Sequence, residues 1–575
     1  MKKYKVSFSE FILPIIVTVL FLLGYFYIVL PPINLRSPGF WLMLSLAFIV
    51  FVGTYVLWNE VNFFSKLGRA IKRKMFAESN KKKNRTKNSK YDIVFDKETF
   101  GIPKWIFISV ISFASVIGLI LVATLFTSTK LFRARAYQQM LTVTESDFEK
   151  DIKELSFEQI PIVDRDTAEQ FGKRVVGEVR ELVSQFNVAN YYSQINYQSK
   201  PYRVTPLEYA GYFKWSSNKK DGIPYYISID MATQKTDLVE LPDGMKYSPS
   251  EYFKRDLKRH VRLKHPTKMF EDISFEIDDS GAPYWVMSYF EYTIGLFGGK
   301  DIAGVILVDA VTGETKDYAV DEVPQWIDQA YSSELLVEQA DNWGTYKNGF
   351  MNSWFVQKDV VVTTEGYNYI ALNDDVWLYT GITSVVADES NIGFILINMR
   401  TKEARTYMIN GAEEYSAMES AQGQIQEKSY SATFPILLNV ADRPTYFMSL
   451  KDNAGLVKSY AFVSVAEYHI VGVGESIQSA REEYLRLLGV NENNNSGTSG
   501  ATETVTGIIE AISSAVVNQN SVYYIKLQGK DGIYKANITL SDILPFLAVG
   551  DDVTFKADEK GKIVQIAYTP VTETP

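Results

Sequence analysis

Three long stretches without a charged residue constrain the fold of this chain more than any other feature. They run from Phe11 to Leu35, from Ser37 to Asn59 and from Trp105 to Thr129. A helix rises about 1.5 Å per residue, so roughly 20 apolar residues cross a hydrocarbon core of about 30 Å. Each stretch is long enough, and we therefore predict a three-helix membrane anchor over residues 1–130.

The distribution of charge predicts the orientation of this anchor. Residues 1–104 carry 13 Lys and 4 Arg against 6 Asp and Glu, a balance of +11, although the whole chain has a net charge of −9. Most of the basic residues lie in the connection 59–104, and the positive-inside rule places such a loop in the cytoplasm. We predict a multi-pass protein of the cell membrane with a cytoplasmic N-terminus, an extracellular C-terminal part and the lipid bilayer as a partner.

A turn pattern occurs three times after the anchor, in "ISIDMATQKTDLV" from Ile227, "ILVDAVTGETKDY" from Ile306 and "ILINMRTKEARTY" from Ile395. Each copy has Asp or Asn followed three residues later by Thr, and these side chains accept hydrogen bonds from turn backbone. The pattern predicts three β-hairpins. A calcium site is the weaker interpretation, because the closing Glu of an EF-hand loop is missing.

Amphipathic helices are expected before the sets of strands, over 166–186, 248–265, 412–426 and 476–488. One such helix against one antiparallel sheet forms an α+β layer pair. The predicted fold class is therefore an α-helical membrane anchor followed by α+β modules with antiparallel sheets and a C-terminal small β-barrel. The expected divisions after the anchor are a first module 131–245, a second 246–330, third and fourth units 331–489, a linker 490–504 and the barrel 505–570.

Two stretches of this sequence resemble known families. A helix followed by "FEIDDSGAPYWVMS" and "IAGVILVDAVTGETKDYAV" resembles the PepSY module, best over Ser248–Val320 and more weakly over Phe171–Leu241 and Ala412–Val473. The third turn departs from the pattern, with Lys402 where glycine is expected. The resemblance implies ligand binding or peptidase regulation at the cell envelope, and it supplies no catalytic residues. The order of strands after residue 505 resembles an OB-like barrel.

The composition restricts the chemistry of the chain. It has no cysteine and three histidines, and His260 and His265 are five residues apart, which places them on different faces of a helix. We predict no catalytic, cofactor-binding or metal-ligating residue. A large exported part without cysteine behind a retained anchor suits a Gram-positive envelope.

One basic helix is the candidate site. Lys254, Arg255, Lys258, Arg259 and Arg262 stand out in an otherwise acidic region and could contact teichoic acids or lipid headgroups. The alternative interpretation is a solvated helix face. Nucleic acid is an unlikely partner, because the basic connection 59–104 lacks interleaved aromatic residues in its lysine-rich core.

The function predicted from these features is that of a scaffold or regulator at the cell envelope. It would act by binding a wall polymer, a peptide or another envelope protein. The alternative is a wall-modifying hydrolase that uses carboxylates, although the sequence singles out no carboxylate pair among its 68 Asp and Glu.

Overall fold

The computed structural model describes residues 9–58, 104–385, 390–490, 503–517, 520–530, 532–541, 543–557, 561 and 563–568. The basic connection 59–103 and most of the predicted linker 490–504 lie outside these residues. The chain divides into two compact units, Met1–Tyr484 and Leu485–Pro575. The helix-and-sheet modules expected between residues 131 and 484 therefore belong to a single compact unit.

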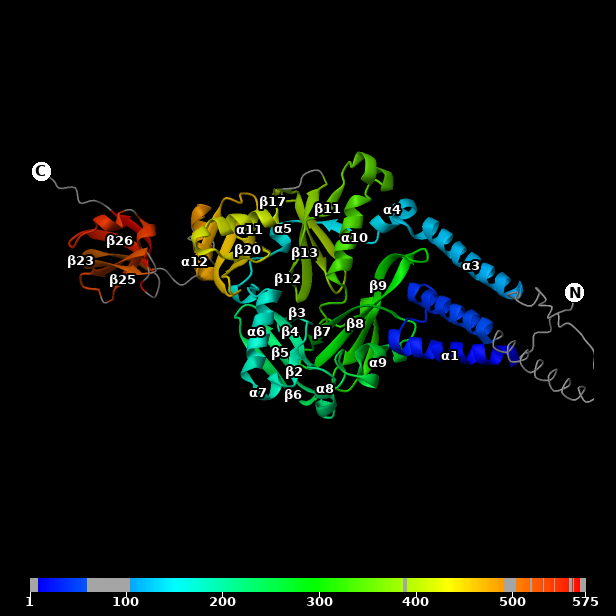
Figure 1. Cartoon of the computed structure of the whole chain (residues 1–575). Helices are drawn as coiled ribbons and strands as arrows, with labels where there is room; N and C mark the ends of the chain where they lie inside the picture. Colours follow the sequence, from blue (N-terminus) through cyan, green and yellow to red (C-terminus); the bar gives the residue numbers. More distant parts are fainter. Residues whose placement is uncertain are drawn as a thin grey trace, which may run out of the picture. The chain divides into compact units, whose positions relative to one another are not determined.

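The prediction of three long apolar helices near the N-terminus is confirmed (Figure 1). These helices are α1 (Ser9–Val29), the helix Pro38–Trp58 and α3 (Lys104–Ser128), and each is long and apolar enough to cross a membrane. Large aliphatic side chains such as Leu20 and Leu119 are mostly exposed on them. Apolar surface on this scale is favourable against lipid and unfavourable against water.

The ends of α1 and α3 contact the sheet-rich part of the same unit. Arg262 donates from Nε to the carbonyl oxygen of Leu30, just after α1, over 2.9 Å. The backbone N–H of Leu296 donates to Oγ of Ser128, at the end of α3, over 2.9 Å. These two helix ends therefore lie beside the sheets, whereas the basic connection joins the C-terminal end of the helix Pro38–Trp58 to the other end of α3.

Four large antiparallel sheets follow the anchor along the chain (Figure 1). The first contains β2 (Phe186–Val188), β3 (Ser193–Tyr197), β4 (Lys200–Tyr209), β5 (Ile223–Asp230) and β6 (Thr236–Met245). The second contains β7 (Met269–Ile277), β8 (Pro283–Ile294), β9 (Gly298–Asp309) and β10 (Thr315–Ala319). In the second sheet, β7 to β10 pair in chain order through hairpin connections. In the first sheet, β4, β5 and β6 also pair in chain order, with the short helix α8 (Tyr212–Asn218) in the connection between β4 and β5.

The third and fourth sheets repeat this order. The third contains β11 (Val361–Thr363), β12 (Asn368–Leu372), β13 (Asp375–Ser384), β15 (Gly393–Asn398) and β16 (Ala404–Tyr407). The fourth contains β18 (Ser431–Ala432), β19 (Ile436–Val440), β20 (Arg443–Lys451), β21 (Val457–Ser464) and β22 (Val471–Gly474). A short pair of strands, β14 (Ser390–Asn391) and β17 (Gly411–Ala412), is separate from them.

The segment before the first sheet pairs with elements far along the chain. Strand β1 (Val143–Glu145) joins the third sheet in parallel with β16, with Val143 opposite Ala404. Asn439 of the fourth sheet donates from Nδ2 to the carbonyl oxygen of Ile152 over 2.7 Å. The expected first module 131–245 assigned this segment to the first sheet, and a three-residue strand is too short to reveal its distant partner by periodicity.

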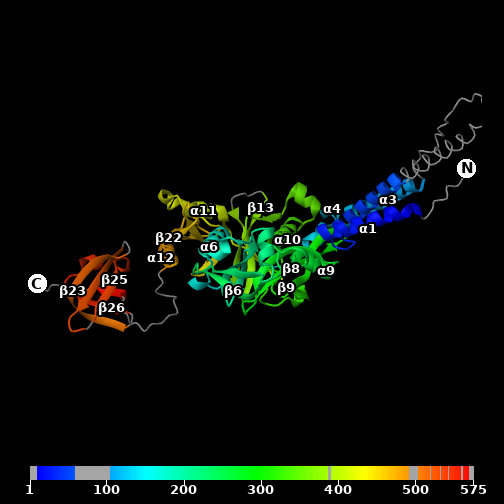
Figure 2. The same ribbon diagram turned by 60° about the horizontal axis from the view of Figure 1, so that its bottom comes forward.

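A helix precedes each of the four sheets (Figure 2). These helices are α6 (Arg165–Glu178), α9 (Leu257–Lys264), α10 (Ser333–Thr345) and α11 (Glu414–Gly423), and α12 (Ile477–Leu487) follows the last sheet. The sequence analysis did not predict α10. Its buried face includes the polar Gln339 and Asn342, which weakens the apolar periodicity.

Two predicted helix starts were wrong, because aspartates other than the expected residues cap the helices. Asp164, and not Asp166, accepts a hydrogen bond from the backbone N–H three residues on over 3.0 Å. Asp256 does the same over 2.8 Å, so the basic helix begins at Leu257 and not near Ser248. Capping of the first free N–H groups fixes where each helix starts.

The three repeated turns are confirmed as equivalent hairpins. Oδ1 of Asp230, Asp309 and Asn398 accepts hydrogen bonds from the backbone N–H groups two and three residues on, over 2.8–2.9 Å. The residue after the threonine has a positive φ in each turn: 64° at Gln234, 73° at Gly313 and 62° at Lys402. The departure from glycine at Lys402 therefore leaves the geometry of the turn unchanged.

The C-terminal unit contains the five predicted strands. They are β23 (Glu503–Val517), β24 (Asn520–Leu527), β25 (Tyr534–Asn537), β26 (Asp552–Ala557) and β27 (Ile563–Tyr568), and they form one antiparallel sheet in the order β25-β24-β23-β26-β27. Ile509, Ile525 and Phe555 are fully buried in its core. Within the described residues no strand pairing closes this sheet, so the barrel remains a prediction.

Candidate functional site

The first strand of each large sheet is interrupted at an equivalent place. Strands β2 and β3 both pair with β4 and leave 189–192 between them, while β11 and β12 both pair with β13 and leave 364–367. Strands β18 and β19 likewise leave 433–435 opposite β20, and β7 shifts its register between Phe270 and Ile273. Such irregularities end the ladder locally and redirect side chains away from the sheet.

The four interruptions contribute to one cavity with a volume of about 510 Å³. Its lining includes residues 190–194, 272–274, 367–369 and 433–434. The segment 329–334, which leads into α10, completes one side. A cavity of this size is typical of a binding site for a small molecule or for the end of a polymer.

Arg203 is the central charged group of the cavity. It lies on β4, and its side chain is almost fully buried. Its Nη2 donates to Oε1 of Gln194 over 3.0 Å and its Nη1 donates to the carbonyl oxygen of Tyr192 over 3.5 Å, while Nε has no hydrogen-bond partner in the described part of the chain. Burial lowers the pKa of Arg203, yet a guanidinium stays protonated in proteins. The cavity therefore presents a buried cation whose donors are only partly used.

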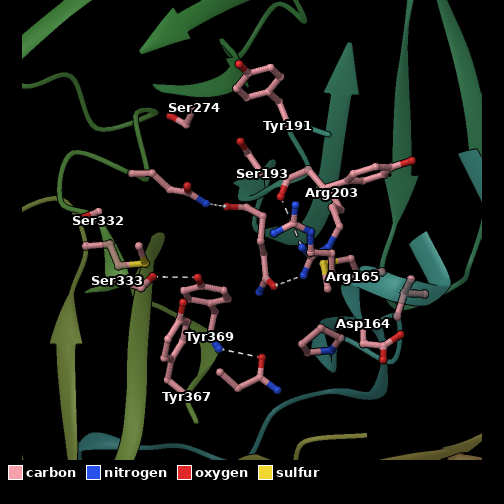
Figure 3. A pocket seen from close by; sticks show the side chains of 18 of the residues that line it. Asp164, Arg165, Tyr191, Ser193, Arg203, Ser274, Ser332, Ser333, Tyr367 and Tyr369 are labelled. Atoms are coloured by element: carbon pink, nitrogen blue, oxygen red, sulfur yellow. Dashed lines mark hydrogen bonds between the residues drawn. The ribbon is translucent and has the colours of Figure 1, made fainter. Parts of the chain in front are cut away.

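Hydroxyl groups face Arg203 from another sheet (Figure 3). Tyr369 of β12 and Ser333 of α10 share a hydrogen bond of 2.8 Å between their hydroxyl oxygens. Burial raises the pKa of Tyr369, so its phenol stays neutral at physiological pH. Oγ of Ser332 is buried and has no hydrogen-bond partner among the described residues. This wall can both donate and accept hydrogen bonds.

The carboxylates around the cavity leave its centre positive. Asp164 accepts a hydrogen bond from Nζ of Lys451 over 2.5 Å. Burial alone would raise the pKa of Asp164, but the hydrogen bonds from Lys451 and Thr167 lower it below its ordinary value. Asp166, Asp272 and Glu334 lie at exposed positions of the lining. None of the four carboxylates forms an ion pair with Arg203 among the described residues.

Six aromatic rings supply part of the apolar lining, together with aliphatic side chains such as Ile162, Met231 and Ile436. The rings are those of Tyr191, Tyr192, Tyr331, Tyr367, Tyr369 and Phe434. Rings with a polar tip can pack against the apolar face of a sugar or a peptide while their hydroxyl groups bind its polar atoms. The cavity thus combines one buried cation, hydroxyl groups and aromatic surfaces.

A pair of buried carboxyl groups lies next to the cavity without lining it. Glu276 of β7 accepts hydrogen bonds from the backbone N–H of Asp328 and from the hydroxyl of Ser274, both over 2.8 Å. Asp328 accepts from the backbone N–H of Asn196 of the first sheet over 2.7 Å. Burial raises the pKa of both carboxyl groups. The pair connects the first and second sheets to the segment before α10.

The candidate residues predicted from the sequence do not line the cavity. The structure places three of them in internal contacts, namely Arg255, Arg259 and Arg262, and two at exposed positions, namely Lys254 and Lys258. They belong to α9 and the turn before it, beside the end of α1. The basic helix and the cavity are therefore separate features.

The sequence analysis missed Arg203. The only local signal is an arginine between Tyr202 and Val204 in a stretch suited to a strand. That pattern is equally typical of an edge strand with an exposed cation. The burial of Arg203 depends on the other sheets around it, and these are distant in sequence.

Metal binding has no structural support in the described part of the chain. No group of three His, Asp or Glu side chains there could hold an ion. Nε2 of His260 lies 2.8 Å from the carbonyl oxygen of Gly313, and Nε2 of His265 is buried without a hydrogen-bond partner among the described residues.

Comparisons with known proteins do not identify the chain. No protein-family model matches it, and neither does any curated protein sequence. Among solved structures it is similar to a levansucrase variant of B. megaterium, with a TM-score of 0.15 and 9% identity over 76% of this chain and 93% of that chain. It is also similar to an alpha-L-arabinofuranosidase from Lactobacillus brevis, with a TM-score of 0.16 and 8% identity over 67% of this chain and 99% of that chain. At these TM-scores the likeness supports neither a fold nor a function.

Proposed function

We propose that this chain is a membrane-anchored protein of the cell envelope that binds a polar, anionic ligand in the cavity around Arg203. The ligand would be a fragment of wall polymer or a peptide that carries a carboxylate or a phosphate. Binding would make the protein a receptor, scaffold or regulator rather than an enzyme. The buried guanidinium of Arg203, with Nε lacking a partner, is the observation that carries this proposal.

The proposed orientation follows from charge and from contacts. The end of α3 that contacts the sheets, at Ser128, lies opposite the end that follows the basic connection 59–103. The end of α1 that contacts the sheets, at Leu30, leads into the helix Pro38–Trp58, and the basic connection begins at the far end of that helix. Basic loops stay in the cytoplasm. The sheets and the cavity would then face the outside of the cell, as the acidic balance of the C-terminal part also favours.

The chemistry of the ligand follows from the donors in the cavity. A buried cation without a counter-ion is unfavourable, and an anion that accepts hydrogen bonds from the guanidinium compensates it. The hydroxyl groups of Ser332, Ser333 and Tyr369 would bind further oxygen or nitrogen atoms of the ligand. The aromatic rings would pack on its apolar faces.

The test is titration calorimetry of the purified full chain with soluble wall fragments and with acidic peptides. Arg203→Met should abolish binding, because methionine keeps most of the volume and removes every donor. Arg165→Met is the matched control, since Arg165 lies at the exposed rim and donates to Asn190 over 2.8 Å. Equal affinity of Arg203→Met and the unmodified protein would overturn the proposal.

The same samples distinguish the alternative of a wall-modifying hydrolase. Fragments recovered after incubation should be unchanged in mass if the chain only binds them. Cleavage that is lost when Asp272 or Glu334 is replaced by the amide would instead favour the enzyme, because these two acids line the cavity.

A further inference from the structure

An exposed aromatic and basic surface surrounds the start of α9. It consists of Tyr212 and Phe213 of α8 (Tyr212–Asn218) together with Tyr252, Phe253, Lys254, Lys258 and Leu263, and it is called the α8–α9 surface below. Phe213 is 82% exposed and Phe253 is 55% exposed. Exposure of these apolar rings is unfavourable in water, and ring contacts through Tyr212, Trp215 and Tyr252 connect them.

Contacts with the end of α1 place this surface at the same depth, relative to the bilayer, as the end of that helix. The guanidinium of Arg259 is 4.4 Å from the ring centroid of Tyr27, in the last turns of α1. Arg262 donates to the carbonyl oxygen of Leu30 directly after that helix. The backbone N–H of Ile33 donates to the carbonyl oxygen of Pro266, just beyond α9, over 2.7 Å. Because the end of a membrane span lies at the headgroups, α9 lies there as well.

Hydrogen bonds from Arg259 of α9 and from Arg255 of the turn before it stabilise this surface. Nη1 of Arg259 donates to the carbonyl oxygen of Phe253 over 2.9 Å, and Arg255 donates to the carbonyl oxygen of Lys219, next to α8. Phe253 has a φ of 57°, which is uncommon for an aromatic residue and is maintained only by surrounding contacts. In this backbone conformation the ring of Phe253 contacts Trp215 at 5.8 Å between centroids and remains 55% exposed.

The composition of the surface matches the membrane interface. Aromatic rings partition to the headgroup region, and lysines there attract anionic lipids. Tyr212 and Tyr252 contact each other edge to face, with ring centroids 5.3 Å apart, so they form a continuous patch. Lys254 and Lys258 are exposed next to it.

We propose that the α8–α9 surface rests on the lipid bilayer, with its aromatic side chains between the headgroups and with Lys254 and Lys258 on anionic lipids. This contact would hold the sheet-rich part of the first unit at a fixed orientation to the membrane. The proposal rests on insertion of the three apolar helices and is independent of the cavity around Arg203.

The absence of cysteine from the chain makes the test direct. Single nitroxide labels are attached to Phe213→Cys, Leu263→Cys, Leu20→Cys and Val183→Cys in the full chain reconstituted in nanodiscs. Collision rates with oxygen and with a water-soluble nickel chelate give the depth of each label. Leu20 on α1 reports insertion, and Val183, exposed on α7 (Arg180–Val183), is the aqueous control.

The proposal predicts a deep label at Leu20, labels protected from nickel at Phe213 and Leu263, and a fully accessible label at Val183. The proposal would be overturned if the labels at Phe213 and Leu263 were as accessible to nickel as the label at Val183 while the label at Leu20 was deep. That result would still support insertion of α1 in the membrane. A water-like label at Leu20 would overturn both the anchor and the proposal.

The contribution of the lysines is tested by comparing zwitterionic nanodiscs with nanodiscs that contain phosphatidylglycerol. Protection of the Phe213 label from the nickel chelate should increase when the nanodiscs contain the anionic lipid. The double variant Lys254→Gln, Lys258→Gln should lower the preference for anionic over zwitterionic nanodiscs by roughly tenfold. The control pair is Lys153→Gln with Lys173→Gln, which are exposed on other elements. Equal effects of the two pairs, or a preference for soluble polyphosphate without any change in label depth, would overturn the assignment to lipid.

Discussion

Two buried arginines of this protein have opposite environments. Arg203 and Arg262 are each 6% exposed, and neither forms an ion pair with a carboxylate among the described residues. The guanidinium of Arg262 donates to the carbonyl oxygens of Leu30, His265, Pro266 and Lys268 and packs on the ring of Phe270 at 4.6 Å. The guanidinium of Arg203 has one side-chain acceptor, one long contact to a carbonyl and an unused Nε.

The difference teaches how to tell a structural cation from a binding cation. Backbone carbonyls compensate the charge of Arg262, so its hydrogen bonds stabilise the junction between α1 and the second sheet. Arg203 is left partly uncompensated in front of a cavity. A buried charge of that kind is unfavourable for stability. Under the proposed function, the anionic ligand would supply the missing partner.

The largest expected effect is that of Arg262→Met. It leaves several carbonyl oxygens without a donor, and we expect a loss of about 3 kcal/mol in the free energy of unfolding. The apparent melting temperature of the full chain in detergent measures it. A variant as stable as the unmodified protein would show that the junction with α1 does not depend on these hydrogen bonds.

The second effect concerns the acid pair beside the cavity. Burial raises the pKa of Glu276 to about 7, so the folded chain retains a proton that the unfolded chain releases at lower pH. This contribution to stability is complete below about pH 4.5 and is lost as the pH rises through about 7. Glu276→Gln should therefore flatten the fall in melting temperature between pH 5 and pH 7.

The control for this pH dependence is Glu314→Gln, at an exposed position of the second repeated turn. It should keep the slope of the unmodified protein. An equally steep slope in Glu276→Gln would contradict the assignment of the slope to the buried pair.

The third effect is the converse of the first. Arg203→Met removes a poorly compensated charge, so we expect the stability to stay within about 1 kcal/mol of the unmodified protein or to rise. Ligand binding should nevertheless be lost. Destabilisation as large as that of Arg262→Met would abolish the distinction between the two arginines.

The smallest effect is expected from Tyr27→Leu. The change removes the ring that stacks on Arg259 but keeps an apolar side chain at the end of α1. We expect a loss of about 0.5–1 kcal/mol, the usual value of one exposed cation–π contact. Thermal unfolding in the same detergent measures it, with Tyr25→Leu, also on α1, as the matched control.

Much of the architecture could be predicted from the sequence because the responsible interactions are local. The three apolar helices are continuous stretches, and the hairpins at Asp230, Asp309 and Asn398 need hydrogen bonds only within three residues. The helix starts were less predictable, since Asp164 and Asp256 compete with other polar residues nearby. The parallel pairing of β1 joins residues far apart in the chain.

The candidate site was decided almost entirely by tertiary structure. Each interruption lies in a different sheet, and none is informative until the four are brought to one cavity. Prediction from the sequence was limited in the same way at the basic helix. The sequence predicted five equivalent cations, whereas the structure has three arginines in internal contacts and two exposed lysines.

The sequence by itself determined the apolar anchor, the asymmetry of charge around it and the repeated hairpins, because each depends on residues that are neighbours in the chain. Tertiary structure alone decided that Arg262 donates to the carbonyl of Leu30 at the end of α1, in addition to carbonyls just after α9, and that Arg203 lines a cavity with a donor unused. The physical reason is that the free energy of a buried charge is set by its partners, and these partners come from segments that only folding brings together.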